Sequence, residues 1–106
     1  MSNRNLVLMI LLFSISISAN DSLLIDVRTI NEFESGHIED SLNIEWQNIS
    51  SITNKITTDQ KIYLYCRSGR RSQKATEILL ELGYKDVTNI GGIKEASKAL
   101  NKKIIQ

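Results

Sequence analysis

The single cysteine of this 106-residue chain, Cys66, lies where its thiol could act as a nucleophile. It follows a predicted strand and precedes a predicted helix, so loop N–H groups and the positive end of the helix dipole surround it. Three arginines, Arg67, Arg70 and Arg71, lie within five residues of it. Such surroundings lower the pKa of a cysteine from about 8.5 to between about 3.5 and 7.5. The segment therefore predicts a thiolate nucleophile combined with an anion-binding loop.

The residues after the cysteine suit an anion site. A guanidinium fork matches a tetrahedral oxyanion, and Gly69 permits a tight loop. An alternative is an inert core thiol beside surface arginines, because free cysteine is among the most buried residue types. The polar flanking residues favour the reactive thiol. The candidate site consists of Cys66 as the nucleophile and the ligand-binding residues Arg67, Ser68, Gly69, Arg70, Arg71 and Ser72.

Length and composition exclude several classes of protein. A chain of this length forms one domain, and 42% hydrophobic with 24% charged residues is the composition of a globular protein. A net charge of +1 is not that of a nucleic-acid-binding protein. A single cysteine excludes an internal disulfide, and the chain contains neither a Cys/His zinc cluster nor a phosphate-binding P-loop. We therefore expect neither a metal ion nor a cofactor.

The N-terminus has the layout of a secretory signal. Arg4 precedes an uncharged stretch with an apolar run over residues 6–13, and the small residues Ser16, Ser18 and Ala19 follow. The run is shorter than the roughly 20 residues of a membrane span, and an uncleaved anchor is the alternative. We expect a signal peptide over residues 1–19 and one mature domain over residues 20–106, free of the membrane after cleavage.

Short β-branched runs alternate with helical patterns along the rest of the chain, which predicts an α/β domain with a parallel sheet. Thr29 and Glu32 have the spacing of a capping box at a helix start. The longest predicted helix spans residues 73–82, with Ser72 as its cap and Gly83 as its stop. The predicted strands are residues 23–27, 41–44, 61–65 and 86–90, and the predicted helices are residues 29–36, 45–52, 73–82 and 93–100.

From about residue 23 to residue 98 the chain resembles one protein family, the single-domain rhodaneses. Several spaced motifs agree in order, which makes the resemblance more specific than any one motif alone. The motifs that carry it are residues 24–28, 32–33, 36–38, 41–44, 65–72, 82–84, 87 and 91–92.

The resemblance implies a rhodanese-like α/β fold, with a small central parallel sheet flanked by helices on both faces. It also implies the activity of a thiosulfate sulfurtransferase. The Cys66 thiolate would attack the outer sulfur of thiosulfate, sulfite would leave, and the persulfide would pass its sulfur to cyanide or a thiol. The arginines would bind the sulfonate end, Arg71 and Arg67 more than Arg70. We expect a periplasmic monomer that acts on small molecules and has no nucleic-acid partner.

Five other residues are expected to have structural roles near the site. In the family that the chain resembles, Asp26 and Arg28 form an ion pair and a turn, and His37 belongs to a packing turn after a helix. His37 as a general base for the thiol is the alternative, which is less favoured because the loop itself ionises the thiol. Gly91 and Gly92 would let the backbone pass close to the active loop.

Other functions stay open beside this one. A persulfide carrier or binding module would receive sulfur from a partner protein and turn over little thiosulfate, and an inactive interaction domain is a weaker variant of it. A cysteine-dependent phosphatase or arsenate reductase is the other alternative, and the motif of those enzymes has five residues between the cysteine and an arginine. Ser72 occupies that arginine position here, and Arg71 comes one residue earlier. The shorter loop favours sulfur chemistry among the proteins that this chain resembles.

Overall fold

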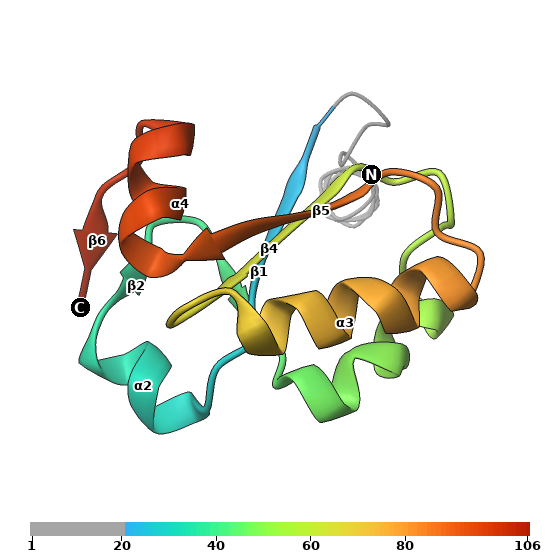
Figure 1. Ribbon diagram of the computed structural model, residues 1–106, viewed down its shortest axis with the longest axis horizontal. Coiled ribbons are helices and arrows are strands. Elements are labelled where there is room, and N and C mark those ends of the chain that lie inside the picture. Colours follow the sequence, from blue (N-terminus) through green and yellow to red (C-terminus); the bar gives the residue numbers. More distant parts are fainter. Residues whose placement is uncertain (1–20) are drawn as a thin grey trace, which may run out of the picture.

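The computed structural model describes residues 21–106. The predicted signal peptide and the cleavage point after Ala19 lie outside the described residues. Among the residues that are described, no helix has both the length and the apolar character needed to cross a membrane. The described part of the chain is built around one parallel sheet with helices on its two faces (Figure 1).

Four parallel strands form the central sheet in the order β3-β1-β4-β5. These strands are β1 (Leu23–Asp26), β3 (Leu42–Asn43), β4 (Ile62–Cys66) and β5 (Val87–Gly92). β1 and β4 are central, and Asp26 pairs with Tyr65 near their carboxyl ends. The strand order runs outward from β1 to β3 on one side and from β4 to β5 on the other. Open α/β sheets bind ligands at the carboxyl ends of strands where the order reverses in this way.

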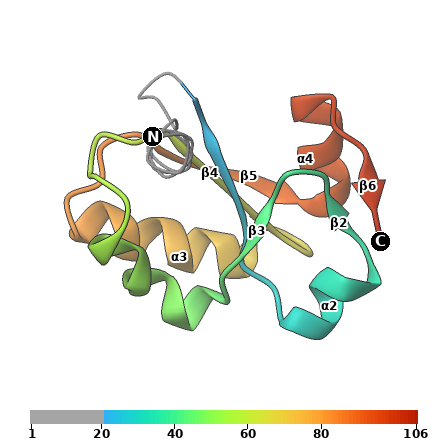
Figure 2. The same cartoon turned by 180° about the vertical axis from the view of Figure 1, so that it is seen from behind.

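Helices cover both faces of the sheet (Figure 1, Figure 2). α3 (Arg70–Glu81) and the 3-10 helix η1 (Trp46–Asn54) pack on one face, and α4 (Ile93–Leu100) packs on the other. Successive residues of β4 serve the two cores, since Leu64 belongs to the first and Tyr65 to the second. Two apolar faces explain why the strands are almost continuously apolar in sequence. The predicted fold class, with helices on both faces of a parallel sheet, is confirmed.

The capping box predicted after the first strand is present. α2 covers Ile30–Ser35, and the Glu32 backbone N–H donates to Thr29 Oγ1 while Glu32 Oε1 accepts from the Thr29 backbone N–H. At the other end of the helix, the Gly36 N–H donates to the carbonyl of Phe33. Local sequence signals therefore fix both ends of α2, which lies at the rim of the site.

The helix after the cysteine begins earlier than predicted. α3 starts at Arg70 and not at residue 73, and its N-cap is Gly69 with a left-handed φ of +96°. The prediction that Ser72 caps this helix is wrong, because Ser72 lies in the first turn. A residue without a Cβ atom adopts the left-handed conformation at little cost. Gly69 thus closes the loop early and brings the first-turn N–H groups close to the Cys66 sulfur.

Two further elements differ from the sequence prediction. The segment predicted as a weak helix over residues 45–52 is the 3-10 helix η1, whose buried residues Ile49 and Ile52 recur at the three-residue period of that helix. A second, two-stranded antiparallel sheet pairs β2 (His37–Ile38) with β6 (Ile104–Ile105). Strands of two residues carry no alternation pattern, so the sequence offers no signal for this pairing.

Candidate active site

Cys66 is the last residue of β4 and lies beneath the N-terminal turn of α3. It is almost fully buried, with 1% of its surface exposed. Its Sγ atom accepts hydrogen bonds from the Gly69 backbone N–H at 2.9 Å and from the Ser72 hydroxyl at 3.4 Å. The sulfur therefore sits in a ring of donors contributed by the loop and the first helical turn.

Two opposing effects act on the pKa of the Cys66 thiol. Burial raises the pKa, because a charged sulfur loses its hydration. Hydrogen bonds from the Ser72 hydroxyl and from the backbone N–H groups of Ser72, Ser68 and Gly69 outweigh burial, and the pKa lies below its usual value. The direction of this shift is the one predicted from the sequence. Its main cause is the set of loop and helix donors, with the charge of Arg71 acting in the same sense.

The backbone of β5 passes close to the loop, as predicted from the glycines at positions 91 and 92. A Cβ atom added to Gly92 would lie 2.5 Å from the carbonyl oxygen of Arg67, and one added to Gly69 would lie 3.3 Å from the Gly91 Cα atom. Cys66 pairs with Gly92 across a register shift between β4 and β5. The glycines therefore provide the space in which the loop folds over the strand.

Arg71 is held by an acidic partner that the sequence did not reveal. Its Nη1 and Nη2 atoms donate to Glu32 Oε1 and Oε2 at 2.7 and 3.0 Å, and each side chain is 28% exposed. The hydrogen bond from Arg71, together with those from Thr29, lowers the pKa of Glu32 to about 2. The same hydrogen bond raises the pKa of Arg71. Glu32 thus links the capping box of α2 to the first turn of α3.

The remaining loop side chains lie at the surface. Arg67, Ser68 and Arg70 are exposed, and within residues 21–106 neither Arg67 nor Arg70 makes a side-chain hydrogen bond or ion pair. A cleft of about 650 Å³ lies beside the loop, between α2 and the start of α4. Among the residues that line this cleft are Arg28, Glu32, Arg67, Ile93, Lys94 and Glu95.

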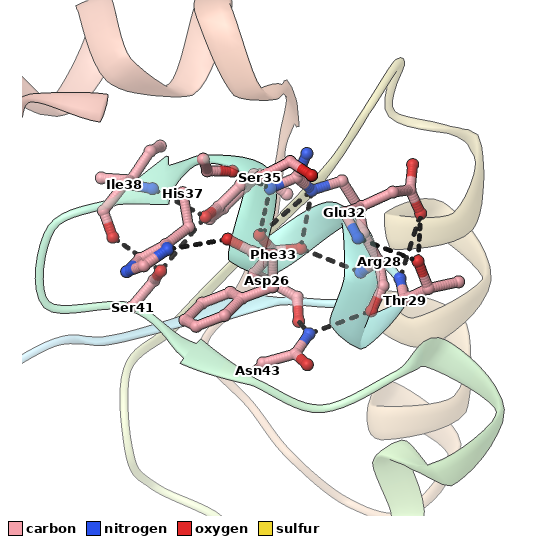
Figure 3. Close-up of polar contacts among 12 residues, drawn as sticks. Asp26, Arg28, Thr29, Glu32, Phe33, Ser35, His37, Ile38, Ser41 and Asn43 are labelled. Atoms are coloured by element: carbon pink, nitrogen blue, oxygen red, sulfur yellow. Dashed lines mark hydrogen bonds and ion pairs between the residues drawn. The ribbon is translucent and has the colours of Figure 1, made fainter. Parts of the chain in front are cut away.

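Asp26 and Arg28 form a buried ion pair at the carboxyl end of β1 (Figure 3). Arg28 Nη2 donates to Asp26 Oδ2 at 2.7 Å, Nε donates to both carboxylate oxygens, and Nη2 also donates to the Gly36 carbonyl at 2.6 Å. Burial lowers the pKa of Arg28, and the hydrogen bonds and charge of Asp26 raise it further than burial lowers it. Asn43 donates to the carbonyls of both residues. The pair joins β1, β3 and the end of α2 into one wall of the site.

His37 lies at the start of β2, and its polar contact is with α2. Nδ1 is 2.9 Å from the Phe33 carbonyl oxygen, and the two rings stack with their centroids 3.7 Å apart (Figure 3). The hydrogen-bond partners of the Cys66 sulfur are Gly69 and Ser72 instead. This geometry does not favour His37 as a general base for the thiol.

Asn89 is a site residue that sequence reasoning missed. Its Oδ1 atom accepts from the Ser72 hydroxyl at 2.7 Å and from the Gly91 N–H at 2.9 Å, and its Nδ2 atom donates to the Gly69 carbonyl at 2.9 Å. Asparagine is depleted in strands, so an asparagine within a predicted strand could have indicated a functional residue. Lys94, on the wall of the cleft, has no such signal in the sequence.

Comparison with known proteins places the chain in a family. The rhodanese-like domain family matches residues 15–99. Thiosulfate sulfurtransferase PspE of Escherichia coli is 32% identical over 97 residues, which cover 90% of this chain and 92% of that protein. YqhL of Bacillus subtilis, an uncharacterized protein, is 42% identical over 73 residues, which cover 68% of this chain and 58% of YqhL.

The solved structures agree with this result. A structure described as rhodanese with anions from E. coli is 32% identical, has a TM-score of 0.66 and covers 71% of this chain and 91% of its own. A rhodanese-like domain from Anabaena, at 20% identity and a TM-score of 0.72, supports the fold alone. The resemblance predicted from the sequence is therefore confirmed, and the chain belongs to the rhodanese-like family of sulfurtransferases.

Proposed function

We propose that the chain is a thiosulfate sulfurtransferase that works through a persulfide on Cys66. The observation that carries the proposal is the position of Sγ, which lies at the carboxyl end of β4 and accepts hydrogen bonds from Gly69 and Ser72. Donors placed in this way shift the thiol toward its thiolate form, which is the nucleophile, without a separate general base.

The reaction has two displacement steps at sulfur. In the first, the Cys66 thiolate attacks the outer sulfur of thiosulfate, a bond forms between Sγ and that sulfur, and sulfite leaves with the electron pair of the broken sulfur–sulfur bond. In the second, cyanide or a thiolate attacks the outer sulfur of the persulfide, and the Cys66 thiolate leaves. With cyanide the products are sulfite and thiocyanate, and no oxidant, reductant or cofactor is consumed.

The loop suits both charge states of the cysteine. The negative charge lies on Sγ in the thiolate and on the outer sulfur in the persulfide. The backbone N–H groups of Ser68 and Gly69 lower the pKa of Cys66 from one side of the sulfur, and that of Ser72 lowers it from the helix. Donors fixed in a water-poor loop stabilise developing negative charge without having to reorganise.

Among the arginines, Arg67 is the best placed to bind the sulfonate group. It lines the cleft beside the loop and has no ion-pair partner within the described residues. Arg71 was expected to share this role, but the Glu32 carboxylate occupies both of its terminal nitrogens and neutralises its charge. Arg70 is exposed at the first position of α3. We therefore rank Arg67 above both.

Two relatives support the choice of donor. The E. coli relative that spans 90% of this chain is named a thiosulfate sulfurtransferase. The similar E. coli rhodanese structure is described as containing anions, which agrees with an anionic sulfur donor.

The test is to incubate the protein with thiosulfate and cyanide and to measure thiocyanate. We expect turnover by the wild-type protein and none by Cys66→Ser. Intact-mass measurement after thiosulfate alone should show a gain of one sulfur atom on the wild-type protein only. A protein that accepts sulfur from another persulfide but neither gains sulfur from thiosulfate nor forms thiocyanate would be a carrier, and the proposal would be wrong.

We also propose that the chain is exported and processed after Ala19, from the signal-like pattern of residues 1–19. Fractionation of a Gram-negative host should place a shortened form in the periplasm. A full-length form in the membrane fraction would contradict this and indicate an anchor.

A further inference from the structure

The Ser72 hydroxyl has one proton and two acceptors. Ser72 is fully buried in the first turn of α3, so no bulk water competes for this group. Its Oγ atom lies 2.7 Å from Asn89 Oδ1 and 3.4 Å from Cys66 Sγ, and both distances are ordinary for their atom types. A hydroxyl carries a single donor, so it can serve only one of the two acceptors well at a time.

The orientation of the Asn89 amide is fixed by its other partners. Nδ2 donates to the Gly69 carbonyl at 2.9 Å and to Gln73 Oε1 at 3.1 Å, and both of these oxygens can only accept. Oδ1 must therefore face Ser72, and it also accepts from the Gly91 N–H at 2.9 Å. This second bond leaves Oδ1 satisfied when the Ser72 proton turns away.

We propose that Asn89 Oδ1 and Cys66 Sγ compete for the Ser72 hydroxyl proton, which makes Asn89 a positioning residue that controls how much thiolate is present. With the neutral thiol, Ser72 donates to Asn89 and can accept from the thiol S–H. When the thiol loses its proton, the hydroxyl rotates and donates to the negative sulfur, and Oδ1 keeps the Gly91 N–H. Only a hydroxyl hydrogen moves in this exchange.

The exchange has a consequence for the reaction, and this part rests on the proposed function. In the persulfide the charge has moved to the outer sulfur, so Sγ is a poorer acceptor than in the thiolate. The hydroxyl proton then returns to Asn89. When the second displacement regenerates negative charge on Sγ, Ser72 can donate to it again and stabilise the leaving thiolate.

The experiment measures the ionisation of Cys66 directly and does not depend on sulfur transfer. The rate of alkylation by iodoacetamide is followed against pH in wild type, Asn89→Leu, Ser72→Ala and the double variant. Leucine has the same number and branching of side-chain heavy atoms as asparagine, although its methyl groups are larger, and it offers no acceptor. The Gly69 carbonyl keeps its bond from the Gln73 backbone N–H, so the loop retains an anchor.

We expect Ser72→Ala to shift the alkylation midpoint to higher pH and Asn89→Leu to shift it to lower pH. Each shift should correspond to about a fivefold change in the thiol–thiolate equilibrium, the size of one ordinary hydrogen bond. In the Ser72→Ala background, Asn89→Leu should cause no shift. Gln73→Ala, which removes a partner of Nδ2 but none of Oδ1, is the matched control and should leave the midpoint unchanged.

Several outcomes would overturn the inference. A midpoint that Asn89→Leu leaves unchanged or raises, or an equal shift with and without the Ser72 hydroxyl, would show that Asn89 only holds the loop. If Asn89→Leu does not fold, Asn89→Asp provides the opposite test, because a carboxylate retains the Ser72 proton more strongly. Its upward shift should be larger with Ser72 present than in the Ser72→Ala background, and equal shifts would reject the competition.

Other charged groups around the loop are the same in all these variants, so their effects on Cys66 cancel in each comparison. They are Asp26 and Arg28 at the end of β1, Glu32 of α2, Arg67 of the loop, Arg71 of α3, and Lys94 and Glu95 of α4. Loss of thiocyanate formation with the alkylation pattern intact would reject the proposed function and leave the competition standing.

Discussion

Replacing Glu32 by glutamine should release Arg71 toward the anion site while leaving the cap of α2 in place. In the wild type, Glu32 Oε1 accepts from the Thr29 N–H at 3.1 Å, and both carboxylate oxygens accept from Arg71. Glutamine can keep the bond to Thr29, since a capping box accepts either residue type. The negative charge opposite Arg71 is lost. The substitution thus separates the charge of Glu32 from its structural role.

The cost in stability follows from the pKa of Glu32, which the fold lowers from 4.5 to about 2. Each pKa unit corresponds to about 1.4 kcal/mol, but solvent screens a partly exposed pair, so we expect a contribution of about 1 kcal/mol. A carboxylate with a lowered pKa stabilises the fold above its unfolded pKa. Its contribution is lost as the pH falls from 4.5 toward about 2. Urea unfolding should therefore show Glu32→Gln to be less stable than wild type by about 1 kcal/mol at neutral pH and equally stable near the acid limit.

The effect on activity should have the opposite sign. Without Glu32, the Arg71 guanidinium can turn its fork to a dianionic substrate, and the charge near Cys66 becomes more positive. We expect the KM for thiosulfate to fall about fivefold, the equivalent of about 1 kcal/mol of additional binding, with kcat changed less than twofold. The assay is thiocyanate formation against thiosulfate concentration at low ionic strength, where such interactions are least screened.

Glu34→Gln is the matched control, since Glu34 is an exposed acid on the same helix. It should change neither stability nor KM by a comparable amount. The reasoning would be refuted by a KM that rises in Glu32→Gln, because Arg71 would then need its acidic partner to hold it in a binding position. An equal fall in KM in both variants would show that the effect comes from the general surface charge and not from Arg71.

Four further substitutions test other parts of the site. Gly92→Ala places a Cβ atom 2.5 Å from the Arg67 carbonyl oxygen. Thiocyanate formation should therefore fall at least about tenfold, and the free energy of unfolding should fall by about 1–3 kcal/mol. Wild-type rates of thiocyanate formation would contradict the close packing. Asp26→Asn leaves the Arg28 guanidinium buried without its charge partner and should lower the free energy of unfolding in urea by about 3–5 kcal/mol; a loss below about 1 kcal/mol would count against a buried pair. Arg67→Gln should raise the KM for thiosulfate about tenfold and Arg70→Gln about twofold, and similar rises would reject the ranking.

The features that sequence predicted well are those determined by neighbours within a few residues. The capping box of Thr29 and Glu32 needs only a spacing of three, and it is present as predicted. The central strands can be recognised in the sequence, because each is buried on both faces and nearly all of its residues are therefore apolar. The position of Cys66 at the end of a strand and before a helix follows from these elements.

The features that the sequence could not supply depend on contacts between distant segments. Arg71 and Glu32 are 39 residues apart, and neither residue type alone reveals that they form an ion pair. Ser72 was a reasonable cap by residue type, yet the left-handed conformation of Gly69 starts the helix earlier. That conformation is compatible with the fold because Gly69 and Gly91 pack backbone to backbone, which only the folded sheet can show.

These long-range contacts change the account of how the cysteine is activated. In sequence, three arginines within five residues suggest that positive side chains lower the pKa of Cys66. In the fold, one of them is paired with an acid and another two are exposed, while backbone N–H groups and one hydroxyl reach the sulfur. Fixed short-range donors act on the nucleophile, and Arg67 remains available for the anionic substrate. Salt should therefore weaken substrate binding much more than it changes the ionisation of Cys66, because hydrogen bonds in a buried loop are screened far less than an exposed guanidinium.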